Sequence, residues 1–157
     1  MSNGTSDKEI ANLRHRIRHS AAHVMADAVQ ELFPDVCLAI GPPTEDGFYY
    51  DFDVSQAFVP EDLERIEKIM NERIANDLKF EYHEMNRERA KEIFANQPFK
   101  IEIIDDLPDT EVVTSYQHGN FTDLCQGPHV ESTGKIVAFK LLSIAGAYWR
   151  GDENKPM

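Results

Sequence analysis

A long amphipathic helix near the N-terminus is the strongest constraint that this sequence places on its fold. Ser6 followed by Glu9 matches a capping box, in which two side chains close the first turn of a helix. Apolar residues then recur at steps of three and four positions as far as Pro34, namely Ile10, Leu13, Ile17, Ala21, Val24, Ala28 and Leu32. The sequence therefore predicts one continuous helix that begins at Ser6 and ends before Pro34.

The rest of the chain predicts a mixture of shorter helices and antiparallel strands. Pro60 begins a second amphipathic stretch that reaches Leu78, and Asn86 can cap a short helix that ends near Asn96. Strands are predicted for residues 36–40, 48–54, 80–85 and 99–104, and further antiparallel strands and turns from Val112 onward. We therefore expect an α+β fold, with helices packed on one face of a mainly antiparallel sheet.

Length and composition indicate a single compact domain. The chain has 157 residues, of which 41% are hydrophobic and 10% aromatic, enough for a core of its own. Residues 1–7 are expected to form a flexible leader and residues 8–150 the domain. No apolar run is long enough to cross a bilayer, and the two widely separated cysteines do not indicate a disulfide framework. These features predict a soluble protein of the cytoplasm with no membrane partner.

The charge of the chain limits how it can bind RNA. Sixteen Lys+Arg against 28 Asp+Glu give a formal net charge of -12, which repels a phosphate backbone at long range. Any contact with RNA must therefore be local. The one dense positive cluster is formed by Arg14, Arg16 and Arg18, which can contact phosphates, although a solvated helix start explains these residues equally well.

Two histidines lie four residues apart on the first predicted helix. His19 and His23 therefore project from one face, a spacing that a helix uses to direct two nitrogens at one metal or one water. This face lies roughly 200 to 240° around the helix from Ile17, opposite the apolar stripe and beside Ala22 and Ala26. An ordinary polar helix face would give the same pattern.

A second pair of candidate ligands lies far along the chain, in the sequence Cys-Gln-Gly-Pro-His of residues 125–129. Cys125 and His129 flank a Gly-Pro turn across which their side chains can converge. Together with His19 and His23 they form a plausible tetrahedral set for zinc. A closed structural zinc site and a metal-free, hydrogen-bonded histidine cluster are the alternatives, because four protein ligands leave no open position for water.

Four motifs, taken in order, resemble the second N-terminal domain of bacterial-type threonyl-tRNA synthetases. They are His-Ser-Ala-Ala-His at 19–23, Gly-Phe-Tyr-Tyr-Asp-Phe at 47–52, Phe-Thr-Asp-Leu-Cys-Gln-Gly-Pro-His-Val at 121–130 and Ala-Gly-Ala-Tyr-Trp-Arg-Gly-Asp at 145–152. The likeness begins near His15 and covers nearly the whole chain. The two histidine-containing pieces alone are shared with the related alanyl-tRNA editing proteins. Gln126 and the weakly charged residues 117–120 depart from the family pattern and are expected to weaken a phosphate contact there.

The resemblance implies an editing hydrolase that removes serine wrongly attached to tRNA(Thr). A synthetase that holds threonine by its hydroxyl rejects serine only weakly, because one methyl group is worth about 1 to 3 kcal/mol, so a second site is needed. Residues 151–157 are expected to begin a linker to the aminoacylation core, which this chain lacks, so that it cannot activate threonine with ATP. It is then either a fragment, with the rest of the synthetase as partner, or a stand-alone editing factor.

The resemblance also suggests roles for individual residues around an ordered water that attacks the ester. His19, His23 and His129 are expected to orient or deprotonate this water, and Cys125 to be a hydrogen-bond partner or metal ligand rather than the nucleophile. Either no cofactor or Zn²⁺ is required.

Lys100 and Asp123 are assigned to the site by the same resemblance, and Tyr50 is a further candidate. Lys100 matches a site position, although a lysine at a strand start is usually solvated. Asp123 can fix a histidine tautomer or bind the amino group of the substrate. Tyr50 can form a wall for the terminal adenosine, or simply pack in the core.

Two other functions remain open from the sequence alone. One is a trans-acting deacylase for a different mischarged tRNA, which the shared histidine and cysteine motifs permit. The other is a zinc-stabilised structural or binding module without activity.

Overall fold

The long first helix is the centre of the fold. The structure is a computed structural model that describes residues 6–157, so residues 1–5 of the predicted leader lie outside it. Helix α1 spans Asp7–Leu32, and its capping box is present, with Glu9 N–H donating to Ser6 Oγ at 3.3 Å. Phe33 N–H donates to Val29 O at 2.8 Å and closes the helix before Pro34, as predicted. Asp7 lies in the first helical turn, inside the segment expected to be a leader.

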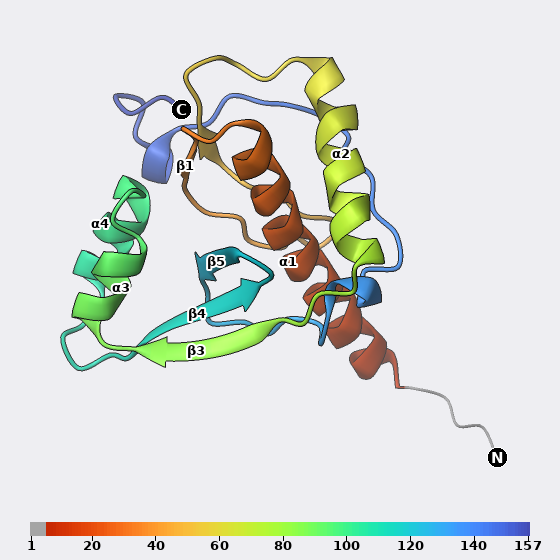
Figure 1. Cartoon of the computed structure of the whole chain (residues 1–157), viewed down its shortest axis with the longest axis horizontal. Coiled ribbons are helices and arrows are strands. Elements are labelled where there is room, and N and C mark those ends of the chain that lie inside the picture. Colours follow the sequence, from red (N-terminus) through yellow and green to blue (C-terminus); the bar gives the residue numbers. More distant parts are fainter. Residues whose placement is uncertain (1–5) are drawn as a thin grey trace.

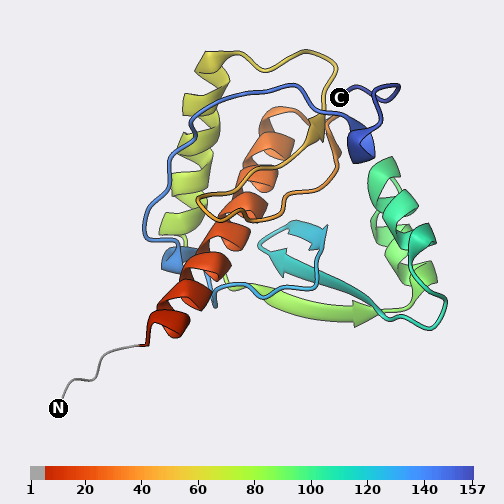
Figure 2. The ribbon, with the colours of Figure 1, turned by 180° about the vertical axis from the view of Figure 1, so that it is seen from behind.

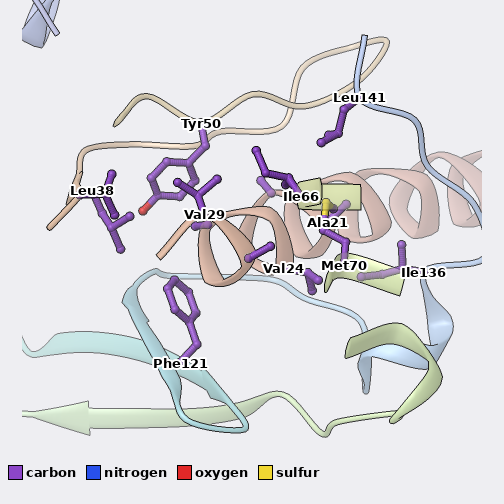
Figure 3. Close-up of a cluster of buried hydrophobic side chains, with 14 of the residues drawn as sticks. Ala21, Val24, Val29, Leu38, Tyr50, Ile66, Met70, Phe121, Ile136 and Leu141 are labelled. Atoms are coloured by element: carbon purple, nitrogen blue, oxygen red, sulfur yellow. The ribbon is translucent and has the colours of Figure 1, made fainter. Parts of the chain in front are cut away.

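Helix α2 lies beside α1 and shares its core (Figure 1). It spans Pro60–Ala75, with Pro60 at its first position and the Asp62 carboxylate accepting the Val59 N–H at 2.9 Å. Figure 3 shows Ile66 and Met70 of α2 among the apolar side chains of α1. The helix ends three residues before the predicted Leu78, because Asp77 has a positive φ of 49° that breaks the helical path.

The strands form two small antiparallel sheets. Strands β1 (Cys37–Leu38) and β2 (Phe52–Asp53) form a short pair, while β3 (Glu81–Met85), β4 (Val113–His118) and β5 (Phe121–Leu124) form a sheet in the order β3-β4-β5. The predicted α+β class is confirmed, with the strands divided between two sheets instead of one. The strands predicted at residues 36–40 and 48–54 do pair with each other, but over only two residues each, and most of the chain between them is irregular.

The prediction of a strand at residues 99–104 is wrong. This segment lies within helix α4, which spans Pro98–Asp106 and begins with Pro98 at a position where a missing N–H costs nothing. Ile101, Ile104 and Leu107 recur every three residues and pack against Ala90 and Phe94 in a second small core. A short apolar run fits both the strand period and the helix period, and here the packing partner decided the outcome.

That partner is helix α3, which spans Arg87–Ile93 and begins at the predicted cap. The Asn86 side chain accepts the Arg89 N–H at 2.8 Å. Figure 2 shows α3 and α4 together at one end of the three-stranded sheet, apart from α2. The structure therefore has two apolar cores, one around α1 and α2 and one where α3 and α4 pack with Val113 and Leu124 of the three-stranded sheet.

The antiparallel strands predicted from Val112 onward are present as β4 and β5, but the chain after β5 is mostly irregular. Within the described residues, it contains the short helical turns Thr133–Lys135 and Trp149–Gly151 but no further paired strand beyond isolated bridges. It runs past α2, where Leu141 enters the main core and its N–H donates to Glu67 at 2.9 Å (Figure 1). None of the helices in the described part of the chain has the length and apolar character needed to span a bilayer.

Replacing Met70 by alanine should destabilise the protein strongly. Met70 is 0% exposed at the contact between α1 and α2, so the change leaves a cavity and should lower the free energy of unfolding by about 2 to 5 kcal/mol. Leu142→Ala is the control, because this side chain is 83% exposed and should cost less than about 0.5 kcal/mol. Urea unfolding measures both, and equal losses would contradict the core described above.

Candidate active site

The two distant motifs meet at one point. His19 and His23 project from the middle of α1, and Cys125 and His129 come from the segment that follows β5. The Cys125 Sγ lies 3.2 Å from His19 Nε2 and 3.1 Å from His129 Nε2. One nitrogen or sulfur from each of the four residues lies within 4.8 Å of all the others. The helix face opposite the apolar stripe is therefore buried, and the alternative of an ordinary polar face is wrong.

The turn between Cys125 and His129 is shaped by Gly127. This residue has a φ of +77°, and a Cβ added to it would lie 2.5 Å from the hydroxyl of Tyr116, so only glycine fits. Gly127 N–H donates to Cys125 Sγ at 3.2 Å. The end of the turn is attached to α1, because Val130 N–H donates to Ser20 Oγ at 3.0 Å.

The proton positions of His19 and Cys125 follow from their partners. His19 Nδ1 lies 3.3 Å from the carbonyl oxygen of Pro128, which can only accept, so Nδ1 carries the proton and Nε2 has a free lone pair. The Cys125 thiol can then donate to His19 Nε2.

Burial keeps this cluster uncharged at neutral pH. It is the main cause that lowers the pKa of His19, and it holds the pKa values of His23 and His129 well below the usual range. Burial also raises the pKa of the Cys125 thiol to about 12. The imidazoles are therefore uncharged at neutral pH, and the thiol is a poor nucleophile without a metal.

A buried ion pair lies beside the histidines. Lys100, from α4, is only 3% exposed, and its Nζ lies 2.7 Å from Asp123 Oδ1. The ammonium also donates to Ala39 O at 2.7 Å and to the Tyr50 hydroxyl at 2.9 Å. The alternative of a solvated Lys100 is wrong, because the chain brings three oxygens to its charge.

Asp123 links this ion pair to the imidazoles. Its Oδ2 accepts the Tyr50 hydroxyl at 2.7 Å and lies 3.9 Å from His23 Nε2, too far for a direct hydrogen bond. Tyr50 contributes its hydroxyl only, because its ring is buried and stacks on Phe52 at 4.8 Å between centroids. The ring thus follows the core-packing alternative and offers no free face for adenosine.

The three arginines divide between two sides of α1. Arg14 and Arg18 line a surface hollow of about 450 Å³ together with His15 and the loop at residues 43–45, which includes the carboxylate of Glu45. Arg16 is exposed and does not line this hollow. None of the three has a carboxylate within ion-pair distance in the described residues.

The four clustered donors fit a metal in part. Zinc with nitrogen ligands near 2.0 to 2.1 Å and one sulfur near 2.3 Å places its ligands about 3.3 to 3.6 Å apart, so the widest separation of 4.8 Å would have to contract. His23 Nδ1 is buried without a hydrogen-bond partner in the described residues, and His19 Nδ1 has the carbonyl partner typical of a metal ligand. His19, His23, Cys125 and His129 would hold the ion, with no position left for water.

The structure adds three residues that the sequence motifs did not identify. Phe80 stacks on the His129 ring at 5.1 Å with an interplanar angle of 7°, and Tyr116 approaches the same ring edge-on at 4.4 Å. Ser20 is buried and its Oγ lies 3.0 Å from His129 Nδ1. Ser20 could have been suspected from the sequence, because it is a hydroxyl residue located between His19 and His23. Phe80 and Tyr116 have no such indication, because aromatic residues are common in strands.

Comparison with known proteins agrees with the motifs. Residues 113–157 match the family described as threonyl and alanyl tRNA synthetase second additional domain. The chain is 55% identical over 141 residues to the threonine–tRNA ligase of Dehalococcoides mccartyi, covering 90% of this chain and 24% of that protein. It is 57% identical over 142 residues to that of Desulforamulus reducens, covering 89% and 22%, and 51% identical over 146 residues to that of Clostridium tetani, covering 92% and 23%.

These matches confirm the resemblance to the second N-terminal domain of threonyl-tRNA synthetases. The chain spans about a quarter of the length of the relatives it matches.

The buried histidines should make the protein less stable in mild acid. Their pKa values are lowered in the folded state, whereas the unfolded chain takes up protons near the ordinary value of about 6.5. As the pH falls below about 6.5, unfolding binds protons, so the free energy of unfolding should fall by up to about 1.4 kcal/mol per pH unit for each of His23 and His129.

Urea unfolding with a chelator present, between pH 7 and 5, measures this slope. His23→Asn should reduce it, and His83→Gln, which alters an exposed histidine on β3, should not. A stability that stays constant over this range would contradict the burial of neutral imidazoles.

Proposed function

We propose that this chain, whose relatives are threonine–tRNA ligases, is an aminoacyl-tRNA editing domain that hydrolyses the ester of serine wrongly attached to tRNA(Thr). The observation that carries the proposal is the convergence of His19, His23, Cys125 and His129 beside the buried pair of Lys100 and Asp123. Neutral imidazoles suit proton transfer from water, and a buried charge pair suits recognition of a small polar group.

Water is the proposed nucleophile. A water that replaces one of the direct contacts of Cys125 would lie within reach of His19 Nε2, whose lone pair can accept its proton. The hydroxide oxygen bonds to the ester carbonyl carbon, and collapse of the tetrahedral intermediate breaks the bond to the ribose 3′ oxygen. As it leaves, that oxygen takes the proton that His19 Nε2 accepted from the water, so serine and an intact tRNA are released.

Cys125 is not expected to attack the ester. With its pKa raised to about 12, the thiol is almost fully protonated at neutral pH. It would serve as a hydrogen-bond partner that holds the water between the imidazoles. Bound zinc would lower the pKa of a coordinated water, provided that one of the four donors stayed off the ion.

The buried ion pair is the proposed recognition element for serine. The α-ammonium group of the seryl ester is attracted to the Asp123 carboxylate, while Lys100 and the Tyr50 hydroxyl hold that carboxylate in place. Threonine differs from serine by one methyl group, which must be excluded sterically, since binding to a matching apolar pocket would discriminate by only about 1 to 3 kcal/mol.

The acceptor end of the tRNA would approach along α1. Arg14 and Arg18, five residues and one residue before His19 on α1, line the hollow described above and can contact backbone phosphates. With a net charge of -12 on the chain, this contact is local and should weaken as salt is added. The rest of a synthetase would have to supply most of the tRNA affinity.

The chain should release serine from Ser-tRNA(Thr) and leave Thr-tRNA(Thr) largely intact. Incubation with Ser-tRNA(Thr), Thr-tRNA(Thr) and Ser-tRNA(Ala), with the remaining labelled amino acid counted over time, tests substrate and reaction together. Preferential release from Ser-tRNA(Ala) would instead favour a deacylase for another mischarged tRNA. Equal or absent release of serine and threonine from tRNA(Thr) would reject the proposal.

His19→Ala and Cys125→Ala should lower deacylation at least about 100-fold while the protein stays folded, because each removes a group that contacts the attacking water. His83→Ala is the control, since this side chain is exposed on β3. Thermal unfolding followed by circular dichroism, with and without a chelator, distinguishes the proposed hydrolase from a zinc-stabilised structural module. If both variants and the chelated protein lose most of their thermal stability, the cluster is a structural zinc site.

A further inference from the structure

Ser20 lies between the catalytic cluster and the backbone of the turn. It is fully buried on α1, one residue after His19. Its Oγ accepts the Val130 N–H at 3.0 Å and lies 3.0 Å from His129 Nδ1. A hydroxyl group in this place can affect both the position of the His129 ring and the location of its proton.

The hydrogen-bond balance of Ser20 determines the direction of this contact. A serine hydroxyl has one hydrogen to donate and two lone pairs to accept with, and Val130 N–H uses one lone pair. The hydrogen needs an acceptor, because a buried hydroxyl without one is costly. Among the described residues, His129 Nδ1 is the acceptor in reach, so the hydroxyl donates to Nδ1 and the neutral ring carries its proton on Nε2.

His129 and His19 are then opposite in character although both direct Nε2 at the same sulfur. His19 donates from Nδ1 to Pro128 O and keeps a free lone pair on Nε2. His129 accepts at Nδ1 and presents a hydrogen on Nε2, 3.1 Å from Cys125 Sγ. The resulting chain runs from Val130 N–H through Ser20, His129, Cys125 and His19 to Pro128 O, and every donor in it has an acceptor.

The packing around His129 supports a single ring orientation. Phe80 stacks on one face of the ring, and the Tyr116 ring approaches at 72°. These aromatic contacts hold the plane of the imidazole, but they do not distinguish its two nitrogens. Ser20 does, because within this cage it is the hydrogen-bonding partner of Nδ1.

We propose that Ser20 is a positioning residue that fixes His129 as a hydrogen-bond donor toward the reaction centre. His129 then cannot take the proton of the attacking water, and His19 is the ring with a lone pair free to do so. His129 instead donates its Nε2 hydrogen to the thiol, or to the oxygen of the water that displaces it. The catalytic part of this inference rests on the proposed function, whereas the tautomer of His129 does not.

The tautomer can be measured directly. In the chain labelled with ¹⁵N at its histidines, two-dimensional NMR distinguishes protonated from unprotonated ring nitrogens. We expect His129 to be protonated at Nε2 and not at Nδ1, and His19 to show the reverse. A wild-type His129 with its proton on Nδ1 would overturn the proposal, whether or not the chain hydrolyses any ester, so this result is independent of the proposed function.

Variants test the consequence for catalysis. Ser20→Ala should reduce kcat about 10- to 100-fold with KM little changed, the usual effect of removing a group that orients a reactive one. It should also allow both His129 tautomers. Ser20→Thr keeps the hydroxyl and should restore the Nε2 tautomer and most of kcat.

Ser115→Ala is the matched control, because Ser115 is equally buried on β4 but its hydroxyl has no partner in the described residues. It should leave the His129 tautomer and kcat unchanged. A Ser20→Ala protein that is less stable but retains the wild-type kcat and tautomer would reduce Ser20 to a structural role and overturn the proposal. If that variant does not fold, the wild-type tautomer decides.

Discussion

The burial of the middle of α1 is the constraint on which the rest of this structure depends. Small side chains at Ala21, Ala22, Ala26 and Ala28 allow neighbouring elements to approach the helix closely. The same turns carry His19 and His23, so the helix contributes to the core and to the site at once. Removing these imidazoles from water makes them neutral, and neutral imidazoles are what proton transfer at ordinary pH requires.

Two kinds of electrostatics lie side by side around Asp123. On one side, uncharged imidazoles and a thiol exchange hydrogen bonds in a fixed direction. On the other side, the Lys100 ammonium and the Asp123 carboxylate form an ion pair. The Tyr50 hydroxyl donates to Asp123 and accepts from Lys100. A buried charge is tolerated only when its remaining hydrogen-bonding capacity is satisfied, and here Ala39 O and Tyr50 do this for Lys100. The fold therefore places a buried ion pair directly beside the uncharged groups that are proposed to move a proton.

Much of this arrangement could be predicted from local sequence patterns. The capping box at Ser6, the apolar repeat of α1 and the cap at Asn86 are short-range signals, and each is present in the structure. The pairing of the histidines with Cys125 and His129 could be inferred because both motifs have a ligand-like spacing. Helix α4 could not be predicted, because its short apolar run fits the period of a strand as well as that of a helix. Only its packing against α3 distinguishes the two. Ser20 is a long-range case as well, because its importance appears only when residue 129 lies against it.

The origin of Lys100 ties the site to a remote part of the molecule. Lys100 belongs to α4, whose apolar residues pack with α3 in the smaller core, while Tyr50 lies in the larger core and Asp123 is on β5, which contributes to both. If the α3–α4 unit moved away, it would leave a carboxylate without its counter-ion and an ammonium group without its three oxygen partners. A substitution that loosens the packing between Ala90 and Ile104 would therefore shift Lys100 and change the electrostatic environment of Asp123, although the substituted side chain does not contact the substrate.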